Sequence, residues 1–133
     1  MAAVVTKYGF VETAKLLTAV DSPVAFAYMA LGKGSQTETS NVSTLATEIT
    51  TSALSRVSAA TVTTASSATT ADTAKFVHTW TADGSKSIKE CGVANASVAN
   101  TGDLLCYATF ASAIPMQSAD TLKVTWSVQV KNG

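Results

Sequence analysis

Hydrophobic and polar residues alternate most regularly near the end of the chain. Leu122, Val124, Trp126, Val128 and Val130 fall on one side of an extended segment, and Thr, Lys, Ser and Gln residues fall between them. Alternation with a period of two predicts a half-buried strand. Sheets covered on both faces give continuous apolar runs instead, so the pattern predicts an antiparallel sheet with one wet face.

The same period, or a run of β-branched residues, recurs earlier in the chain. The predicted strands lie at 24–30, 56–65, 74–81, 86–94 and 104–111. Turn residues at 32–35 and 82–85 end two of them, and a turn-rich tip at 95–103 joins two others as a hairpin. Ile114 and Pro115 are expected to end the pairing. About seven short strands at regular spacing predict a mainly β fold, either an antiparallel β-sandwich or a jelly-roll-like barrel.

One helix and two connections complete this organisation. Between Gly9 and Val20, the residues Phe10, Ala14 and Leu17 share a helical face, which predicts one short N-terminal helix. Residues 36–55 are rich in Thr, Ser and Asn and are expected to form an extended loop, a kind of segment that often docks on a partner. Residues 65–73 are interpreted as a connection or edge, with a flexible tether as the alternative.

Composition excludes some classes of function but does not identify one. The 133 residues predict one domain spanning 1–133, with enough chain to bury a core. Nine basic and nine acidic residues cancel, and only 14% of residues are charged, so copies repel one another weakly. Basic residues are scattered, which argues against nucleic-acid binding. No secretory signal or run of about 20 apolar residues is present, so we expect a product made soluble, without a membrane partner.

The residue types that carry chemistry do not form a recognisable catalytic pattern. His78 is the only histidine and shares a strand face with aromatic residues, which favours packing over catalysis. The Gly-Lys-Gly-Ser run around Lys33 lacks Walker spacing and predicts a turn. Single aspartates at 72, 83, 103 and 120 suit turn capping, although carboxylate pairs can still meet in the fold. We therefore expect no enzyme activity, no catalytic residues, no metal and no cofactor.

Cys91 and Cys106 lie symmetrically about the centre of the predicted hairpin. Both share parity with apolar neighbours, so they are expected to face each other across the two strands. A non-hydrogen-bonded pair at such a position has a Cα separation close to that of a disulfide. Two cysteines do not complete a zinc site, and the choice between a cross-strand disulfide and two buried thiols stays open.

Several segments, taken together, resemble small virion structural proteins of tailed phages, described as head-decoration or tail-fibre-like proteins. The likeness covers most of the chain. It rests on the segments 9–17, 26–34, 45–49, 54–57, 90–96, 102–105, 108–110 and 120–126. In similar proteins the two cysteine positions are commonly small residues, so Cys91 and Cys106 look like an added staple in this chain.

The resemblance implies a virion structural protein, made in the host cytoplasm and released by lysis. The preferred hypothesis is a capsid decoration or cement subunit that binds copies of itself and a major capsid or tail protein. The alternative is a tail or fibre component, or a subunit of a self-assembling tube or filament. A third hypothesis, a receptor- or carbohydrate-binding β module, requires exposed aromatic residues. Trp80 and Trp126 fall within strands, whereas Tyr8 and Tyr107 are candidate surface contacts.

Overall fold

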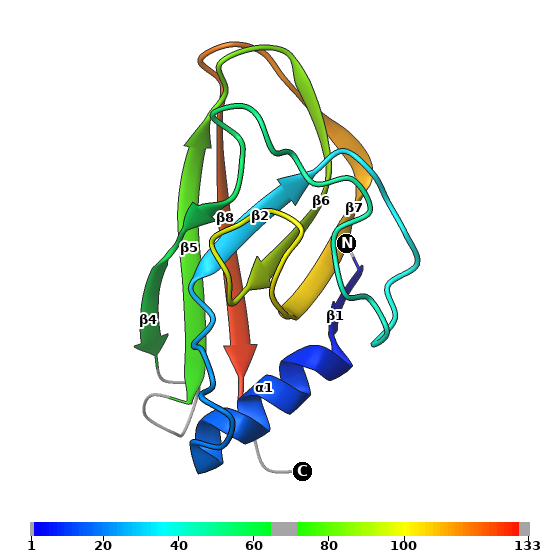
Figure 1. Cartoon of the computed structure of the whole chain (residues 1–133). Coiled ribbons are helices and arrows are strands. Elements are labelled where there is room, and N and C mark those ends of the chain that lie inside the picture. Colours follow the sequence, from blue (N-terminus) through cyan, green and yellow to red (C-terminus); the bar gives the residue numbers. More distant parts are fainter. Residues whose placement is uncertain (1, 65–71, 131–133) are drawn as a thin grey trace.

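Two antiparallel sheets and one helix make up the part of the chain that the structure describes, residues 2–64 and 72–130 of this computed structural model (Figure 1). The elements in chain order are β1 (Ala2–Val5), α1 (Lys7–Thr18), β2 (Tyr28–Gly32), β3 (Val57–Ser58), β4 (Ala60–Thr64), β5 (Thr73–Thr81), β6 (Lys86–Ala94), β7 (Leu104–Met116) and β8 (Thr121–Gln129). The predicted mainly β fold with one N-terminal helix is confirmed.

The sheets differ in size. The larger has the strand order β1-β7-β6-β2-β3, and the smaller has the order β4-β5-β8. Every strand pair is antiparallel. Only one residue separates β3 from β4, so the chain passes from one sheet to the other at that corner. The arrangement is β-sandwich-like, and the jelly-roll form of the prediction is not confirmed.

The main hydrophobic core lies between the two sheets. Phe76 and Trp80 from β5 pack in one cluster with Ile88 and Val93 from β6, and Ile88 and Val93 have no exposed surface. Along β8 the residues at even positions are half-buried and those at odd positions are exposed. The alternation that predicted a strand with one wet face therefore corresponds to one face turned toward this core.

A second apolar cluster lies on the opposite face of the larger sheet. Val42 and Leu45 come from the long irregular segment that follows β2, and they pack against Ala94, Leu104 and Tyr107 of the sheet. Residues 36–55 contain no helix or strand, and Glu48 makes one isolated bridge to Gly32. The loop covers a sheet face that would otherwise be exposed, so most of β2, the second half of β6 and the start of β7 are buried on both sides.

Helix α1 begins and ends with recognisable caps. The Thr6 side chain accepts a hydrogen bond from the Gly9 amide at 3.0 Å, and Ala19 closes the helix in the left-handed conformation, with φ 54°. The buried residues of the helix are Gly9 and Glu12. The apolar face that predicted the helix is not the face that packs on the body.

Two predicted boundaries change, and a third prediction cannot be compared. The first strand after the helix starts at Tyr28 instead of 24, and residues 65–71 of the predicted connection lie outside the described residues. Pairing does not end at Ile114 and Pro115, because Ile114 lies opposite Ile88 and Pro115 lies opposite Ser87. β1 pairs with β7 only as far as Thr109, so the missing N–H of Pro115 falls where that neighbouring strand has ended.

Gly9→Ala should destabilise the protein although it favours the helix. A Cβ at Gly9 would lie 2.7 Å from the Leu105 carbonyl oxygen and 2.8 Å from its Cα. The gain in helix propensity is about 1 kcal/mol, whereas overpacking typically costs about 1–3 kcal/mol and here involves backbone atoms. We expect a lower urea midpoint. Gly84→Ala is the matched control, because nothing lies within 4 Å of its added Cβ, and it should be neutral. A neutral Gly9→Ala would contradict the close approach of α1 to β7.

Candidate functional site

An apolar groove of about 500 Å³ opens at the end of the molecule where α1 lies (Figure 1). Phe10 and Thr13 of α1 line the groove with residues of β5 and β8 and of the segment before β2. The full lining is Val5, Phe10, Thr13, Phe26, Ala74, Phe76, Leu105, Val128, Gln129 and Val130. The groove exists because α1 contacts β7 with its Gly9 face and leaves the end of the smaller sheet uncovered.

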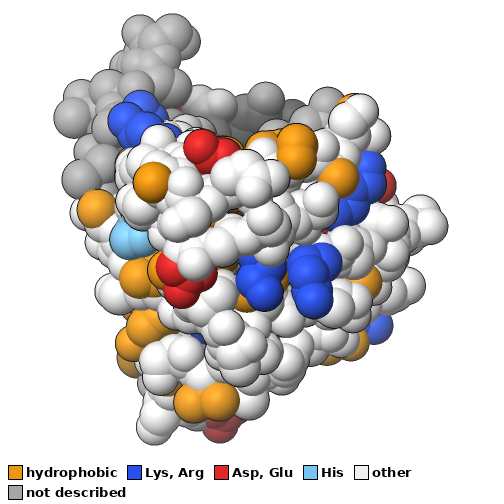
Figure 2. Space-filling model, turned by 90° about the horizontal axis from the view of Figure 1, so that it is seen from above, with side chains coloured by type: hydrophobic (Ala, Val, Ile, Leu, Met, Phe, Trp, Pro, Cys, Tyr) orange, Lys and Arg blue, Asp and Glu red, His pale blue; other side chains and the backbone are white. Residues whose placement is uncertain are grey.

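The exposed apolar residues of α1 extend this groove into a wider surface. Phe10 is 61% exposed and Leu17 is 84% exposed. They are seven residues apart and therefore lie on the same face of the helix. Val20 and Val24, in the segment after the helix, are also exposed. We call the groove together with these four residues the α1 end. Figure 2 shows the opposite end, where apolar side chains form separate spots on a mostly polar surface.

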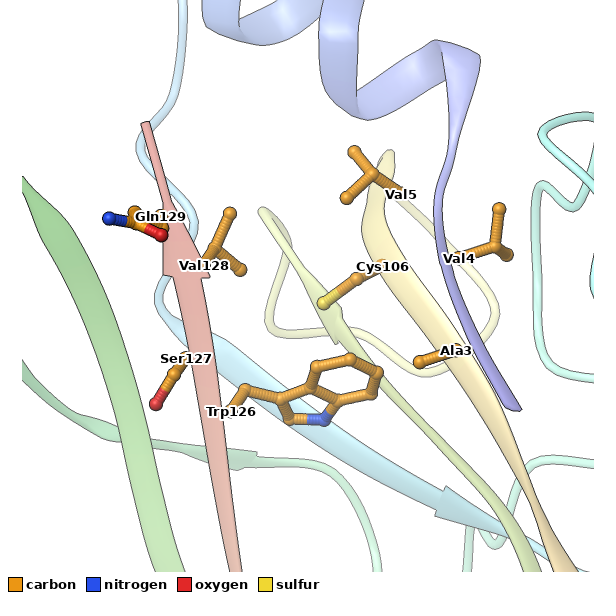
Figure 3. A pocket seen from close by; sticks show the side chains of 8 residues that line it. All are labelled: Ala3, Val4, Val5, Cys106, Trp126, Ser127, Val128 and Gln129. Atoms are coloured by element: carbon orange, nitrogen blue, oxygen red, sulfur yellow. The ribbon is translucent and has the colours of Figure 1, made fainter. Parts of the chain in front are cut away.

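A narrower seam of about 220 Å³ runs between β1 and β8 (Figure 3). Val5 and Cys106 point into it from the larger sheet, and Trp126 and Val128 point into it from β8. The Trp126 indole N–H is buried and makes no hydrogen bond with good geometry. The two sheets therefore separate here, on the side opposite the β3–β4 corner.

The buried acids hold the long loop onto the larger sheet. Glu90 has no exposed surface, and its carboxylate accepts hydrogen bonds from the Ala46 amide at 2.9 Å, the Thr47 amide at 2.7 Å and the Tyr107 hydroxyl at 2.6 Å. A Cβ at Gly32 would lie 2.3 Å from the Glu90 Oε1 atom, so a glycine is needed there. The three donors satisfy the carboxylate within the protein and leave it structural.

A second buried pair ties the same loop to the tip between β6 and β7. Arg56 donates from Nη2 to Glu48 Oε1 at 2.7 Å and from Nε to Oε2 at 3.0 Å, which is a bidentate ion pair. The remaining Arg56 donor reaches the carbonyls of Ala96 and Thr101, and Glu48 also accepts from the Asn100 amide. Both side chains of the pair are almost fully buried. The arginine and the glutamate thus connect the end of the loop to the hairpin tip, 40 or more residues away in sequence.

Sequence reasoning did not find Glu90, Glu48 or Arg56. Alternation in β6 assigns Glu90 to the face opposite Cys91, which is normally the wet face. That face is covered by residues 36–55, and alternation along a strand contains no information about a loop folded over it. The available signal was weaker: Glu48 and Arg56 are isolated charged residues in a segment rich in Ser, Thr and small apolar residues, and Glu90 beside Lys89 has no such signal.

The cysteines do not face each other as expected. Cys91 lies opposite Ala108, and Cys106 lies opposite Val93, so the hairpin register is offset by two residues. Diagonal neighbours have Cβ atoms about 7–8 Å apart, whereas a disulfide needs about 3.5–4.5 Å. Both residues are free, buried thiols in the structure. Burial raises the pKa of Cys91 to about 12, with a smaller opposing effect from the Trp126 indole, and burial also raises the pKa of Cys106.

The other residues weighed for chemistry take structural positions. His78 is half-buried and meets Trp80 edge-on at 4.8 Å between ring centres. Asp83 and Asp120 accept hydrogen bonds from the backbone amides of Ala53 and Gln117, as expected for residues in turns. The Asp72 carboxylate accepts from the side chains of Thr73 and Gln129. The run from Gly32 to Ser35 leads into irregular chain.

One carboxylate pair forms that no sequence pattern predicted. Asp103 precedes β7 and lies beside Glu12 of α1. The pKa of Asp103 is raised, mainly by burial and then by the charge of Glu12, while Lys15 lowers it. Lys15 Nζ lies 3.2 Å from Glu12 Oε1. Neither the groove nor the seam includes these three residues, and they join the buried face of α1 to the start of β7.

The aromatic residues are placed differently from the expectation for receptor binding. Trp80 is buried as predicted, and Trp126 is half-buried in the seam. Tyr107 has no exposed surface, so its assignment as a surface contact is wrong. Its hydroxyl donates a hydrogen bond to Glu90, beneath the covering loop. Tyr8 is half-buried, and Lys7 Nζ lies 5.3 Å from its ring centre.

Comparison with known proteins identified no matching family model, no matching curated protein and no matching solved structure. Within residues 2–64 and 72–130, no group of three or more His, Cys, Asp or Glu residues is placed to hold a metal ion. Helix α1, the only helix in that part of the chain, is too short to cross a membrane.

Glu90→Ala should lower the free energy of unfolding by about 3 kcal/mol or more. The substitution leaves the buried Tyr107 hydroxyl and two part-buried loop amides without their acceptor, and an unsatisfied buried group costs about 1–3 kcal/mol. Tyr107→Phe is the graded control: it removes one donor and keeps the two backbone hydrogen bonds, so about 1 kcal/mol is expected. Urea unfolding gives both values, and hydrogen exchange at the Ala46 and Thr47 amides reports the loop. Equal, small losses in both variants would contradict the role of Glu90.

Neither thiol should react with a thiol reagent at neutral pH until the protein unfolds, when both should react without reductant. Because burial raises the pKa of Cys91 from 9.0 to about 12, the folded state binds the thiol proton more tightly than the unfolded state. This contribution to stability is complete below about pH 9 and is lost as the pH rises toward 12. Cys91→Ala should reduce that alkaline loss. Failure of unfolded, unreduced protein to react would reveal a disulfide and contradict the offset register.

Proposed function

We propose that this chain is a virion structural subunit, a capsid decoration or cement protein that docks on the particle through its α1 end. The observation that carries the proposal is the apolar α1 end itself: an open groove beside a helix face in which Leu17 is 84% exposed. Large apolar patches on soluble proteins mark interaction surfaces. The resemblance of the sequence to tailed-phage virion proteins supplies the kind of assembly.

The distribution of polar groups supports docking more than chemistry. Glu90 and the Glu48–Arg56 pair form their hydrogen bonds with the loop and the hairpin tip, away from the groove. Among the described residues, Thr13 and Gln129 are the only polar ones that line the groove. A surface of this composition gains free energy mainly by excluding water from apolar groups, which suits a protein partner.

Repetition adds to the strength of such contacts. Subunits arranged on a symmetric shell engage many equivalent sites, so a modest contact at each α1 end is enough for stable attachment. The same reasoning applies to a tail or fibre component, which differs in the symmetry of the lattice. The receptor-binding alternative has less support, because Tyr107 and Trp80 are buried.

Leu17→Glu should prevent incorporation into particles while leaving the fold intact. A substitution at a side chain this exposed changes stability by about 0.5 kcal/mol or less, whereas a carboxylate in an apolar contact loses its hydration. Tagged wild-type and variant chains are supplied during particle assembly, and the particles are purified on a density gradient. Wild-type protein should sediment with the particles, and Leu17→Glu should remain in the soluble fractions.

Val98→Glu is the matched control, since Val98 is 64% exposed in the hairpin tip and outside the α1 end. It should sediment like the wild type. Absence of wild-type protein from purified particles would contradict the virion proposal. Equal incorporation of Leu17→Glu would leave a virion role but contradict docking through the α1 end.

A further inference from the structure

The unequal sheets leave one edge of the molecule open. Five strands face three, and the sheets join at the β3–β4 corner, so the mismatch appears at the other side. There β1 and β8, each the outer described strand of its sheet, lie on opposite sides of the seam of Figure 3.

In the part of the chain that the structure describes, the outer edge of β8 is free and has none of the features that usually block strand addition. Among the outer strands of the two sheets, β1 has four residues, β3 has two and β4 has five, whereas β8 has nine. Short strands, prolines, bulges and charges protect sheet edges. β8 contains no proline or glycine, pairs with β5 without a register shift, and has one charged residue, Lys123.

The sequence of β8 is close to symmetric about Trp126. In an antiparallel pair of two β8 strands centred on this residue, Val124 lies opposite Val128 and Thr125 lies opposite Ser127. Lys123 then lies opposite Gln129 of the other copy, so no like charges meet. Pairs of aromatic, of β-branched and of hydroxyl residues are favourable across antiparallel strands.

We propose that two copies of this chain associate through their β8 strands, antiparallel and centred on Trp126. Three strands from each copy then form one continuous sheet. The contact is isologous, as in most dimers, and it closes without further growth at that edge. It also places Val130, which is 75% exposed in the single chain, opposite Leu122 of the second copy. The inference goes beyond docking through the α1 end, because it uses the edge of β8, which meets the groove only at residues 128–130.

The solution mass tests the dimer. Light scattering after size exclusion should give twice the 13.6 kDa mass of one chain for the wild type at about 100 µM, typical of a moderate isologous contact. Thr125→Lys/Ser127→Lys should be monomeric, with association weakened at least tenfold, because each lysine meets a lysine of the other copy. Both positions are exposed in the single chain, so the variant should fold.

Ala60→Lys/Thr81→Lys is the matched control. It adds the same charge at exposed positions of the same sheet, away from the free edge of β8, and should remain dimeric. A monomeric wild type would overturn the proposal, as would a dimer that survives Thr125→Lys/Ser127→Lys. Neither result bears on sedimentation of Leu17→Glu with particles, so the two proposals fail independently.

The register has its own test. Oxidation of a mixture of Thr125→Cys and Ser127→Cys chains should give a disulfide-linked heterodimer on non-reducing gels, because these positions lie opposite each other. Either variant alone, and the wild type with its buried thiols, should stay uncrosslinked. Efficient crosslinking of Thr125→Cys alone would place the two-fold axis at residue 125 and overturn the Trp126-centred register.

Discussion

The burial of Glu90 under the long loop is the interaction on which the rest of this fold depends. A carboxylate without exposed surface is tolerated only when its oxygens are fully hydrogen-bonded, and here two loop amides and the Tyr107 hydroxyl do this. If the loop left, the charge would face an apolar sheet surface. These hydrogen bonds therefore hold the loop on the larger sheet, where it covers Leu104 and Ala94 and places Glu48 beside Arg56. A segment with few apolar residues becomes part of the core because polar contacts hold it there.

This arrangement explains which parts of the structure were predictable. The strands β5, β6 and β8 follow from alternation because one of their faces meets the main core, and periodicity records that fact directly. The Glu90 site could not be predicted, since it depends on a loop crossing the second face of the sheet. The offset of Cys91 from Cys106 was also beyond the sequence, because a long hairpin tip and bulges set the register.

The helix shows a different limit of the same reasoning. Periodicity correctly predicted α1 from Phe10, Ala14 and Leu17, but the face that packs contains Gly9, whose missing side chain allows the backbone to approach Leu105. Close packing through a glycine has no hydrophobic signature. The apolar residues that produced the pattern remain at the surface, where they form the α1 end. The apolar residues of the candidate site were thus visible in the sequence, where they were used only to predict the helix.

The two proposed surfaces have a defined geometric relation. β8 runs toward the α1 end, and Val128 to Val130 line the groove there (Figure 1). Two β8 strands that pair antiparallel place their C-terminal ends in opposite directions, so the two α1 ends would lie at opposite ends of the dimer. Such a dimer is bivalent. A bivalent subunit bridges two neighbouring sites of a lattice, and the second contact then forms at a high effective concentration. The geometry therefore favours a cement that links sites over a cap that covers one.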